Sequence, residues 1–217
     1  MRVTPEQLTH PLRSDARDNR ARIVDAARAL FSTEGLKVPM REVARRAEVG
    51  PATLYRHFPT KQTLTAAVFA DQMRACHRVV DEGCADPDPW RGLCRVIERI
   101  CEEHARDRGF TEAFLTASPQ AVPEGTTVGA PDIAEERART VRAIGELAER
   151  AKSAGRLRPD FVLDDLILML MAHCGIRGAS TTAQVGASRR FAAYVIQAFE
   201  ARPASTPLPA PARLAFP

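Results

Sequence analysis

The sequence lacks a long apolar run and an export signal. Its longest apolar candidate, residues 161–176, is interrupted by Asp164, Asp165 and His173. A membrane-spanning helix needs about 20 predominantly apolar residues, so no span is predicted. The first residues also lack the apolar stretch of a signal peptide. We therefore expect a cytoplasmic chain that does not bind membranes.

Paired cysteines are missing as well. The five cysteines are Cys76, Cys84, Cys94, Cys101 and Cys174, with no C-x-x-C pair. An odd count in a chain without an export signal predicts reduced thiols. Cys101 and His104 lie one helical turn apart, and with His77 and His173 they offer ligands suited to zinc or copper. Ordinary core histidines fit the same pattern and are the favoured interpretation, so no metal and no cofactor is predicted.

No catalytic signature is present. The chain contains no G-x-S-x-G, Walker A loop, G-x-G-x-x-G after a strand, or H-E-x-x-H. The adjacent acids at 102–103 and 164–165 point in different directions around a helix, so neither pair can act as facing acid and base. The chain is therefore predicted not to be an enzyme.

The charge that is present is distributed unevenly. Residues 1–61 hold 12 Lys/Arg against 7 Asp/Glu, whereas residues 62–217 hold 19 against 20. With 45% hydrophobic and 27% charged residues, the whole chain is typical of a globular protein. A basic N-terminal module on a near-neutral body is the pattern expected of a DNA-binding head.

Residues 38–61, reading VPMREVARRAEVGPATLYRHFPTK, contain two short helical patterns separated by a tight break. The first pattern places Val43, Ala44 and Ala47 on one inward face. The second opens with Pro51, which suits the first helical position, after Gly50 at the N-cap. Two such helices form a helix-turn-helix, in which the second helix enters the major groove of DNA.

The side chains of this unit supply cations and hydroxyl groups. A surface helix pair with solvated arginines is the alternative, but the turn, the proline start and the run TLYRHFPTK occur together and favour DNA. Arg41 is a candidate for a guanine edge, a contact worth ~1–3 kcal/mol. Ala52 and Thr53 are candidates for thymine methyl groups, and other contacts would fix register on phosphates. The predicted DNA-binding residues are Arg41, Pro51, Ala52, Thr53, Tyr55, Arg56, His57 and Lys61.

The segment from residue 23 to 64 resembles the DNA-binding domain of the TetR family of bacterial transcriptional regulators. The resemblance is carried by Phe31-x3-Gly35, by V-A-x-x-A at 43–47, by Val49 and T-L-Y-x-H-F at 53–58, and by Lys61. Glu48 stands where the family usually has a turn glycine. A left-handed backbone at that position would cost a non-glycine residue roughly 1 kcal/mol. Gly50-Pro51 replaces the more usual Ser/Thr cap.

No strand-like alternation or internal repeat occurs, so the fold class is predicted to be all-α with nine or ten helices. The expected organisation is a disordered basic arm (1–17), a helix-turn-helix domain (18–64), a helical ligand-binding and dimerisation domain (65–202) and a disordered tail (203–217). The arm either touches DNA or is an untethered terminus. Thr60 and Asp88 are predicted caps, and the proline-rich loop 118–131 is long enough to be mobile or functional.

The last two helices, expected at 164–178 and about 184–202, are apolar over more than one face, which suggests burial in a core or against another subunit. The resemblance implies that they pair with their symmetry mates in a homodimer. A two-fold dimer would present two recognition helices to a pseudo-palindromic operator. The predicted interface residues are Leu166, Leu170, Ile176, Phe191, Val195 and Phe199.

The resemblance also implies a small-molecule pocket in the body. The candidates by pattern are Met73, His77, Trp90, Ile97, Cys101, Phe110, Phe114, Leu147, Met169 and His173, although ordinary core residues look the same. The predicted function is a homodimeric repressor that a small-molecule ligand releases from operator DNA. The alternatives are an activator of the same fold, or a helical ligand-binding protein without specific DNA binding.

Overall fold

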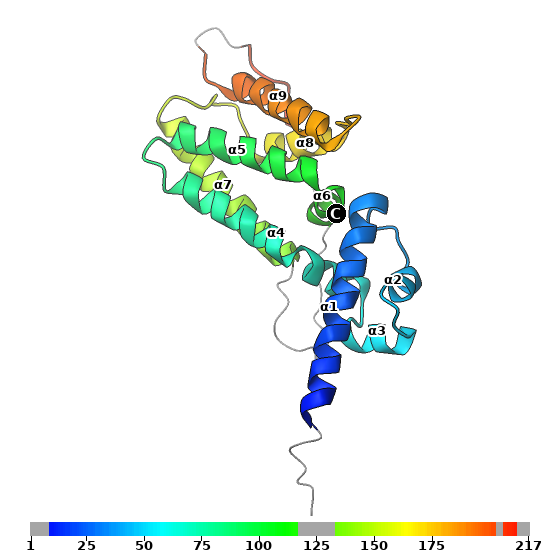
Figure 1. Cartoon of the computed structure of the whole chain (residues 1–217). Coiled ribbons are helices and arrows are strands. Elements are labelled where there is room, and N and C mark those ends of the chain that lie inside the picture. Colours follow the sequence, from blue (N-terminus) through cyan, green and yellow to red (C-terminus); the bar gives the residue numbers. More distant parts are fainter. Residues whose placement is uncertain (1–8, 117–132, 203–205, 212–217) are drawn as a thin grey trace, which may run out of the picture.

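The computed structural model describes residues 9–116, 133–202 and 206–211, and these residues are all-α (Figure 1). The predicted loop 118–131 lies outside them. The described helices are α1 (Thr9–Glu34), α2 (Met40–Arg46), α3 (Pro51–His57), α4 (Lys61–Cys84), α5 (Pro89–Arg106), α6 (Arg108–Thr116), α7 (Ile133–Ser153), α8 (Leu163–His173) and α9 (Thr181–Phe199). None of these helices is both long and apolar enough to cross a bilayer.

Helices α1 to α3 form a head at one end of the molecule (Figure 1). The apolar stripe of α1 is buried, with Ile23 and Phe31 fully inaccessible, and it packs in one core with Leu54 of α3 and Leu64 of α4. Gly35, at φ 75°, ends α1. Helix α1 begins at Thr9, whereas the helix-turn-helix domain was expected to begin at residue 18. The expected unstructured arm is therefore wrong for residues 9–17, and residues 1–8 lie outside the description.

Helix α4 leaves the head and continues into the body, so one rigid element belongs to both (Figure 1). Its start is fixed by the predicted cap, because the Thr60 hydroxyl oxygen accepts from the amide of Thr63 at 3.1 Å. The Thr63 hydroxyl in turn accepts from the amide of Thr60 at 3.2 Å. Asp88 caps α5 in the same way, accepting from the amide of Trp90 at 3.0 Å.

The body is a layer of α4, α5 and α7 with α9 lying along α5 (Figure 1). Helices α4 and α5 touch backbone to backbone beside the turn that joins them. A Cβ atom added to Gly92 would lie 2.2 Å from the carbonyl oxygen of Gly83. This approach is possible only because both residues are glycine.

The C-terminal part differs from the prediction in two respects. Helix α8 ends at His173, before the expected end at 178, and α9 runs from Thr181 to Phe199. The tail was expected to be disordered, but its described residues contact the body. The amide of Leu208 donates to Asp160 Oδ2 at 2.9 Å, and Arg158 donates to the carbonyl of Thr206 at 3.3 Å. A carboxylate and a guanidinium therefore hold residues 206–208 in place.

Candidate nucleic-acid interface and ligand pocket

The turn between α2 and α3 is closed by a left-handed residue. Glu48 has φ 54°, so its backbone is left-handed and the cost stated for a non-glycine residue applies here. The amide of Val49 donates to the carbonyl of Ala44 at 3.0 Å, and the amide of Glu48 donates to that of Arg45 at 3.2 Å. These two bonds form a Schellman motif, which sets the angle at which α3 leaves the turn.

A second contact braces this turn from α1. The guanidinium of Arg22 donates to the carbonyl of Ala47 at 2.7 Å and to the Glu48 carboxylate at 3.4 Å. Arg22 therefore satisfies a backbone carbonyl that the end of α2 leaves free. Sequence analysis did not select Arg22, because nothing in the local pattern of α1 points to the end of α2.

Helix α3 is fixed by one buried side chain and exposes most of the others. Leu54 is fully buried, whereas Pro51, Ala52, Tyr55 and Arg56 are exposed and Thr53 is half-buried. Tyr55 is 51% exposed, which is unusual for a large aromatic side chain without a partner. The residues predicted to meet DNA on α3 therefore share the open side of the helix.

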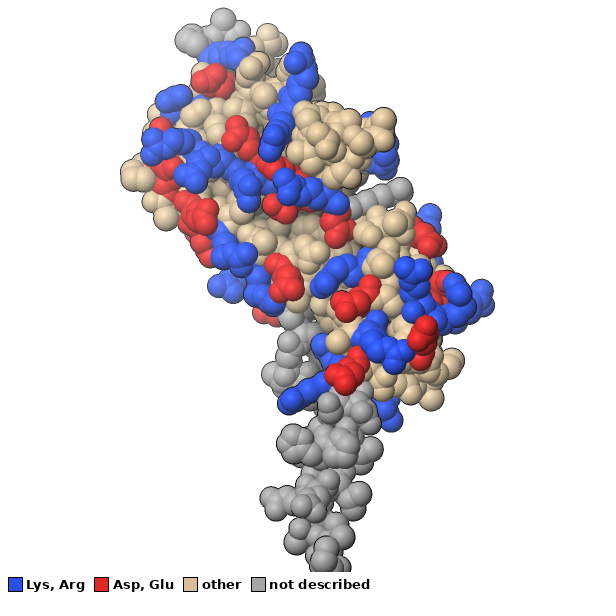
Figure 2. Space-filling model, in the orientation of Figure 1, with Lys and Arg blue, Asp and Glu red and all other residues tan. Residues whose placement is uncertain are grey.

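The arginines of the head differ in their partners. Arg45 is held by Glu42 on the same helix, with Nε 2.9 Å from Oε2, and this hydrogen bond lowers the pKa of the Glu42 carboxyl. On α2 and α3, three exposed arginines make no hydrogen bond or ion pair with any described residue: Arg41, Arg46 and Arg56. Figure 2 shows Lys and Arg side chains around the outer edge of the head, with carboxylates interspersed. Arg46 was not among the predicted contacts, although its free guanidinium qualifies it.

His57 and Lys61 are half-buried, like Thr53 and unlike the five exposed candidates. Burial lowers the pKa of His57, and the charges of Arg56 and Arg20 lower it further. The imidazole is therefore neutral at pH 7 and can serve as a donor but not as a cation. Burial also lowers the pKa of Lys61, whereas the carboxylate of Glu112 on α6 opposes this change. Lys61 is the first residue of α4, beside the free amides of that helix.

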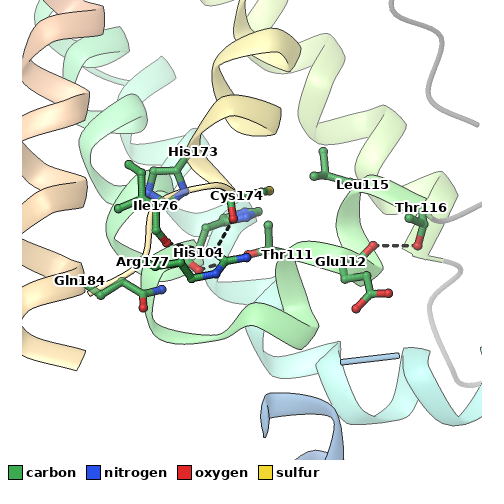
Figure 3. Close-up of a pocket in the computed structure, with 10 residues that line it drawn as sticks. All are labelled: His104, Thr111, Glu112, Leu115, Thr116, His173, Cys174, Ile176, Arg177 and Gln184. Atoms are coloured by element: carbon green, nitrogen blue, oxygen red, sulfur yellow. Dashed lines mark hydrogen bonds between the residues drawn. The ribbon is translucent and has the colours of Figure 1, made fainter. Parts of the chain in front are cut away.

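The body contains a pocket of about 220 Å³ between α5, α6, the end of α8 and the start of α9 (Figure 3). Of the ten predicted ligand-binding residues, His173 alone lines it; His77 is half-buried and the other eight are buried in the body. The pocket is instead lined by neighbours such as His104, Thr111, Glu112 and Ile176. Position in the fold decides between core and pocket here, and residue type does not.

His104 is the unusual group of this pocket. It is 4% exposed, and neither ring nitrogen has a hydrogen-bond partner among the described residues. Burial lowers the pKa of His104 to about 3, with a smaller contribution from His173, so the ring is neutral. His104 had been considered only as a metal ligand. No group of three or more possible metal-binding side chains occurs in the described part of the chain.

His173 is oriented by a hydrogen-bond chain. Ser188 Oγ donates its only hydrogen to the carbonyl of Cys101 at 2.8 Å. Ser188 Oγ also lies 2.6 Å from His173 Nε2, so it must accept there and Nε2 must carry the proton. Nδ1 of His173 is left as an acceptor. Burial lowers the pKa of this histidine as well.

The predicted dimer residues divide into two groups. Leu166, Leu170 and Phe199 are buried inside the protomer, so they are poorly placed to contact a partner. Ile176, Phe191 and Val195 are half-buried. The large exposed apolar side chains on α8 and α9 are Leu168, Met171 and Tyr194, which are 55%, 51% and 55% exposed. Sequence analysis missed Leu168 and Met171 because both faces of α8 are apolar.

Comparison with known proteins agrees with this geometry. Residues 23–68 match the family model described as bacterial regulatory proteins, tetR family. The HTH-type transcriptional repressor KstR of Rhodococcus jostii is 35% identical over 120 residues, 52% of this chain. The chain spans 55% of the length of that relative.

Two solved structures show the same fold. A regulatory protein of the tetR family from Rhodococcus RHA1 superposes with a TM-score of 0.60 at 20% identity, covering 85% of this chain and 98% of that one. RolR in complex with resorcinol gives a TM-score of 0.51 at 18% identity, covering 86% and 89%. The fold and the head thus define a helix-turn-helix regulator. The chain belongs to the TetR family of bacterial transcriptional regulators. Members of this family are not enzymes, in agreement with the missing catalytic motifs.

Proposed function

We propose that the chain is a sequence-specific DNA-binding repressor that acts as a homodimer and is released from its operator by a small molecule. The observation that carries this proposal is the open side of α2 and α3, where arginines without partners lie beside an exposed tyrosine. A relative named as a transcriptional repressor supports repression over activation. A role on chromosomal DNA would place the protein in the cytoplasm.

The contacts follow from exposure and charge. Arg41 would read a guanine edge, and Ala52 and Thr53 at the head of α3 would meet thymine methyl groups. Arg56 and Lys61 would bind phosphates, which position the head without reading sequence. The proposed DNA-binding surface also includes the predicted contacts Pro51, Tyr55 and His57, and we add Arg46 to it.

Dimerisation would use the exposed apolar side chains Leu168, Met171 and Tyr194. An apolar face shared by two helices suits a two-fold contact in which the same patch meets itself. Such a dimer carries two α3 helices, and their separation sets the spacing of the two half-sites.

Ligand control would act as a shift between two populations of the dimer. A ligand weakens DNA binding only to the extent that it prefers the form whose heads no longer match the operator. The pocket of about 220 Å³ supplies a place for such a ligand. The complex of RolR with resorcinol shows that a protein of this fold can hold a small aromatic compound.

Selection of bound DNA from a random pool tests the proposal directly. The expected product is a pseudo-palindromic site, and the binding constant for it should fall steeply as salt rises. Enrichment of no sequence, with no shift of any duplex at low salt, would refute it.

If Tyr55→Ala and Lys61→Ala leave specific and non-specific binding intact, those two residues are not contacts. A reporter assay in a deletion strain separates a repressor from an activator.

A further inference from the structure

The pocket between α5, α6 and the α8–α9 connection contains polar groups that have no hydrogen-bond partner among the described residues. His104 projects from α5, while Thr111, Glu112 and Leu115 come from α6 and Ile176 follows α8 (Figure 3). Most buried polar groups in native proteins are hydrogen-bonded, and an orphaned one costs about 1–3 kcal/mol. Two unpaired nitrogens on a buried ring that lines a pocket therefore suggest that a bound molecule supplies their hydrogen-bond partners.

The two histidines define what such a molecule must offer. A neutral imidazole has one N–H donor and one acceptor nitrogen. His104 has both of these free among the described residues. The Nε2–H of His173 is directed to Ser188, which leaves Nδ1 of that ring as an acceptor. A hydroxyl group can donate to one nitrogen and accept from another. Neither ring carries a charge that would balance an anion, and the guanidinium of Arg177 in the lining donates to two backbone carbonyls, so the group that the rings recognise is neutral.

The volume limits the size of the ligand. A dry cavity of about 150 Å³ is enough to hold benzene, so a pocket of about 220 Å³ holds one ring with a few substituents. Leu115 and Ile176 supply apolar surface for the faces of that ring. Larger polycyclic compounds would require the walls to move apart.

We propose that this pocket binds a monocyclic hydroxylated aromatic compound, a phenol by chemical class, whose hydroxyl group hydrogen-bonds to His104. Glu112 couples the occupied pocket to the DNA-binding head. The first statement concerns the pocket alone, whereas the second rests on the proposed function.

Glu112 suits the coupling role because it borders the pocket and the head at once. Its Oε2 accepts from the amide of Leu36 at 3.0 Å, directly after the turn that ends α1. A Cβ atom added to Gly35 would lie 2.5 Å from the same oxygen, so the carboxylate packs closely against that turn. Its charge also favours the protonated form of Lys61, a proposed phosphate contact.

A second close contact ties α6 to α1. A Cβ atom added to Gly109 would lie 2.5 Å from the carbonyl oxygen of Phe31. A shift of α6 that accommodates a ligand would therefore displace the head or break the bond between Glu112 and Leu36. Either change alters the setting of α1 and the start of α4, which support α3.

Calorimetry on the DNA-free protein tests the pocket. Phenol and resorcinol should bind, and toluene should bind at least tenfold more weakly, since it fills the ring site but leaves His104 unpartnered. Equal binding of toluene and phenol, or no binding of any of the three at millimolar concentration, would overturn the assignment. This comparison needs no variant.

His104→Leu provides a second test. Removing an orphaned buried polar group should leave the melting temperature equal or higher, while phenol affinity falls at least tenfold. Thr140→Val, a buried polar-to-apolar change on α7 outside the pocket, should leave phenol affinity at the wild-type value. Unchanged phenol affinity in His104→Leu would show that this histidine is only a core residue.

The coupling is measured as the ratio of phenol dissociation constants with and without operator DNA. This ratio should exceed one in the wild type and fall toward one in Glu112→Ala, whereas Glu146→Ala, an exposed carboxylate on α7, should keep it. A wild-type ratio of one overturns the coupling. Binding of phenol without any binding of DNA would instead refute the proposed function and leave the pocket assignment intact.

Discussion

The head and the body differ in how their arginine side chains are paired. In the head, Arg41, Arg46 and Arg56 have no partner among the described residues. In the body, several arginines are matched by carboxylates, as in Arg91 with Asp86 and Arg158 with Asp160. Figure 2 shows blue and red side chains next to one another along the body. The body is close to neutral overall, whereas the head carries a net positive charge and exposes arginines on α2 and α3 that are available to a partner outside the chain.

The largest effect is expected from a charge placed on the apolar face of the body. Leu168→Glu should leave the protomer folded, because this side chain is exposed there, but it would bury an unpaired carboxylate in a dimer. Such a burial costs about 3–5 kcal/mol, so the dimer should dissociate at least a hundredfold more readily. Sedimentation measures the dissociation constant. Leu208→Glu, a change at an exposed leucine elsewhere, should remain dimeric, and a stable Leu168→Glu dimer would exclude this face.

The free cations of the head predict the next effect. Arg41→Ala should weaken operator binding by about 1–3 kcal/mol, because its guanidinium has no partner among the described residues and is the proposed contact to a guanine edge. Arg45→Ala is the matched control on the same helix, since its guanidinium is already bound to Glu42. Fluorescence anisotropy with the selected operator gives both affinities. Equal losses for the two variants would mean that only net charge matters.

The left-handed turn residue predicts a smaller effect on folding. Glu48→Gly should relieve roughly 1 kcal/mol of backbone strain and lose an exposed ion pair with Arg22 worth about 0–1 kcal/mol. The net expectation is a modest gain in the free energy of unfolding, measured with urea. Glu48→Ala removes the same ion pair but keeps the strained backbone. It should therefore be no more stable than the wild type.

The smallest effect is expected from the ion pair of Arg91 and Asp86 in the body, which contributes to stability at neutral pH. Hydrogen bonds from Arg91 lower the pKa of Asp86 from an ordinary 3.8 to about 2. A lowered folded-state pKa stabilises the protein above pH 4, and this stability is lost as pH falls toward 2. Arg91→Gln should be less stable than wild type above pH 4, with the difference shrinking below it. Melting temperatures across this range test the prediction, and operator affinity should not change.

Local signals in the sequence predicted much of the head and the starts of α4 and α5. Thr60, Asp88 and Gly35 act through bonds or dihedral angles that depend on residues a few positions away, so their roles could be identified without a fold. The same holds for Leu54, whose buried position follows from the helical period. The unpaired arginines of α2 and α3 could also be recognised, because the side chains that might pair with them on a short helix lie only a few positions away in the sequence.

Contacts between distant residues could not be predicted in this way. The bond between Arg22 and the end of α2, and that between Asp160 and Leu208, join residues that no periodicity relates. The pocket around His104 depends on where α6 and the end of α8 meet, and the pattern-based candidates are mostly core as a result. On α8 an apolar run on both faces concealed which leucines are inward, so Leu166 and Leu170 were chosen where Leu168 is exposed.

The paired glycines at the corner between α4 and α5 also restrict how the molecule can move. With the backbone of Gly92 pressed against that of Gly83, neither helix can slide along the other without a clash. The end of α4 at this corner is therefore held in place, and its other end, at Lys61, lies farthest from the fixed point. A small rotation of α4 about this corner would produce a larger displacement of the head.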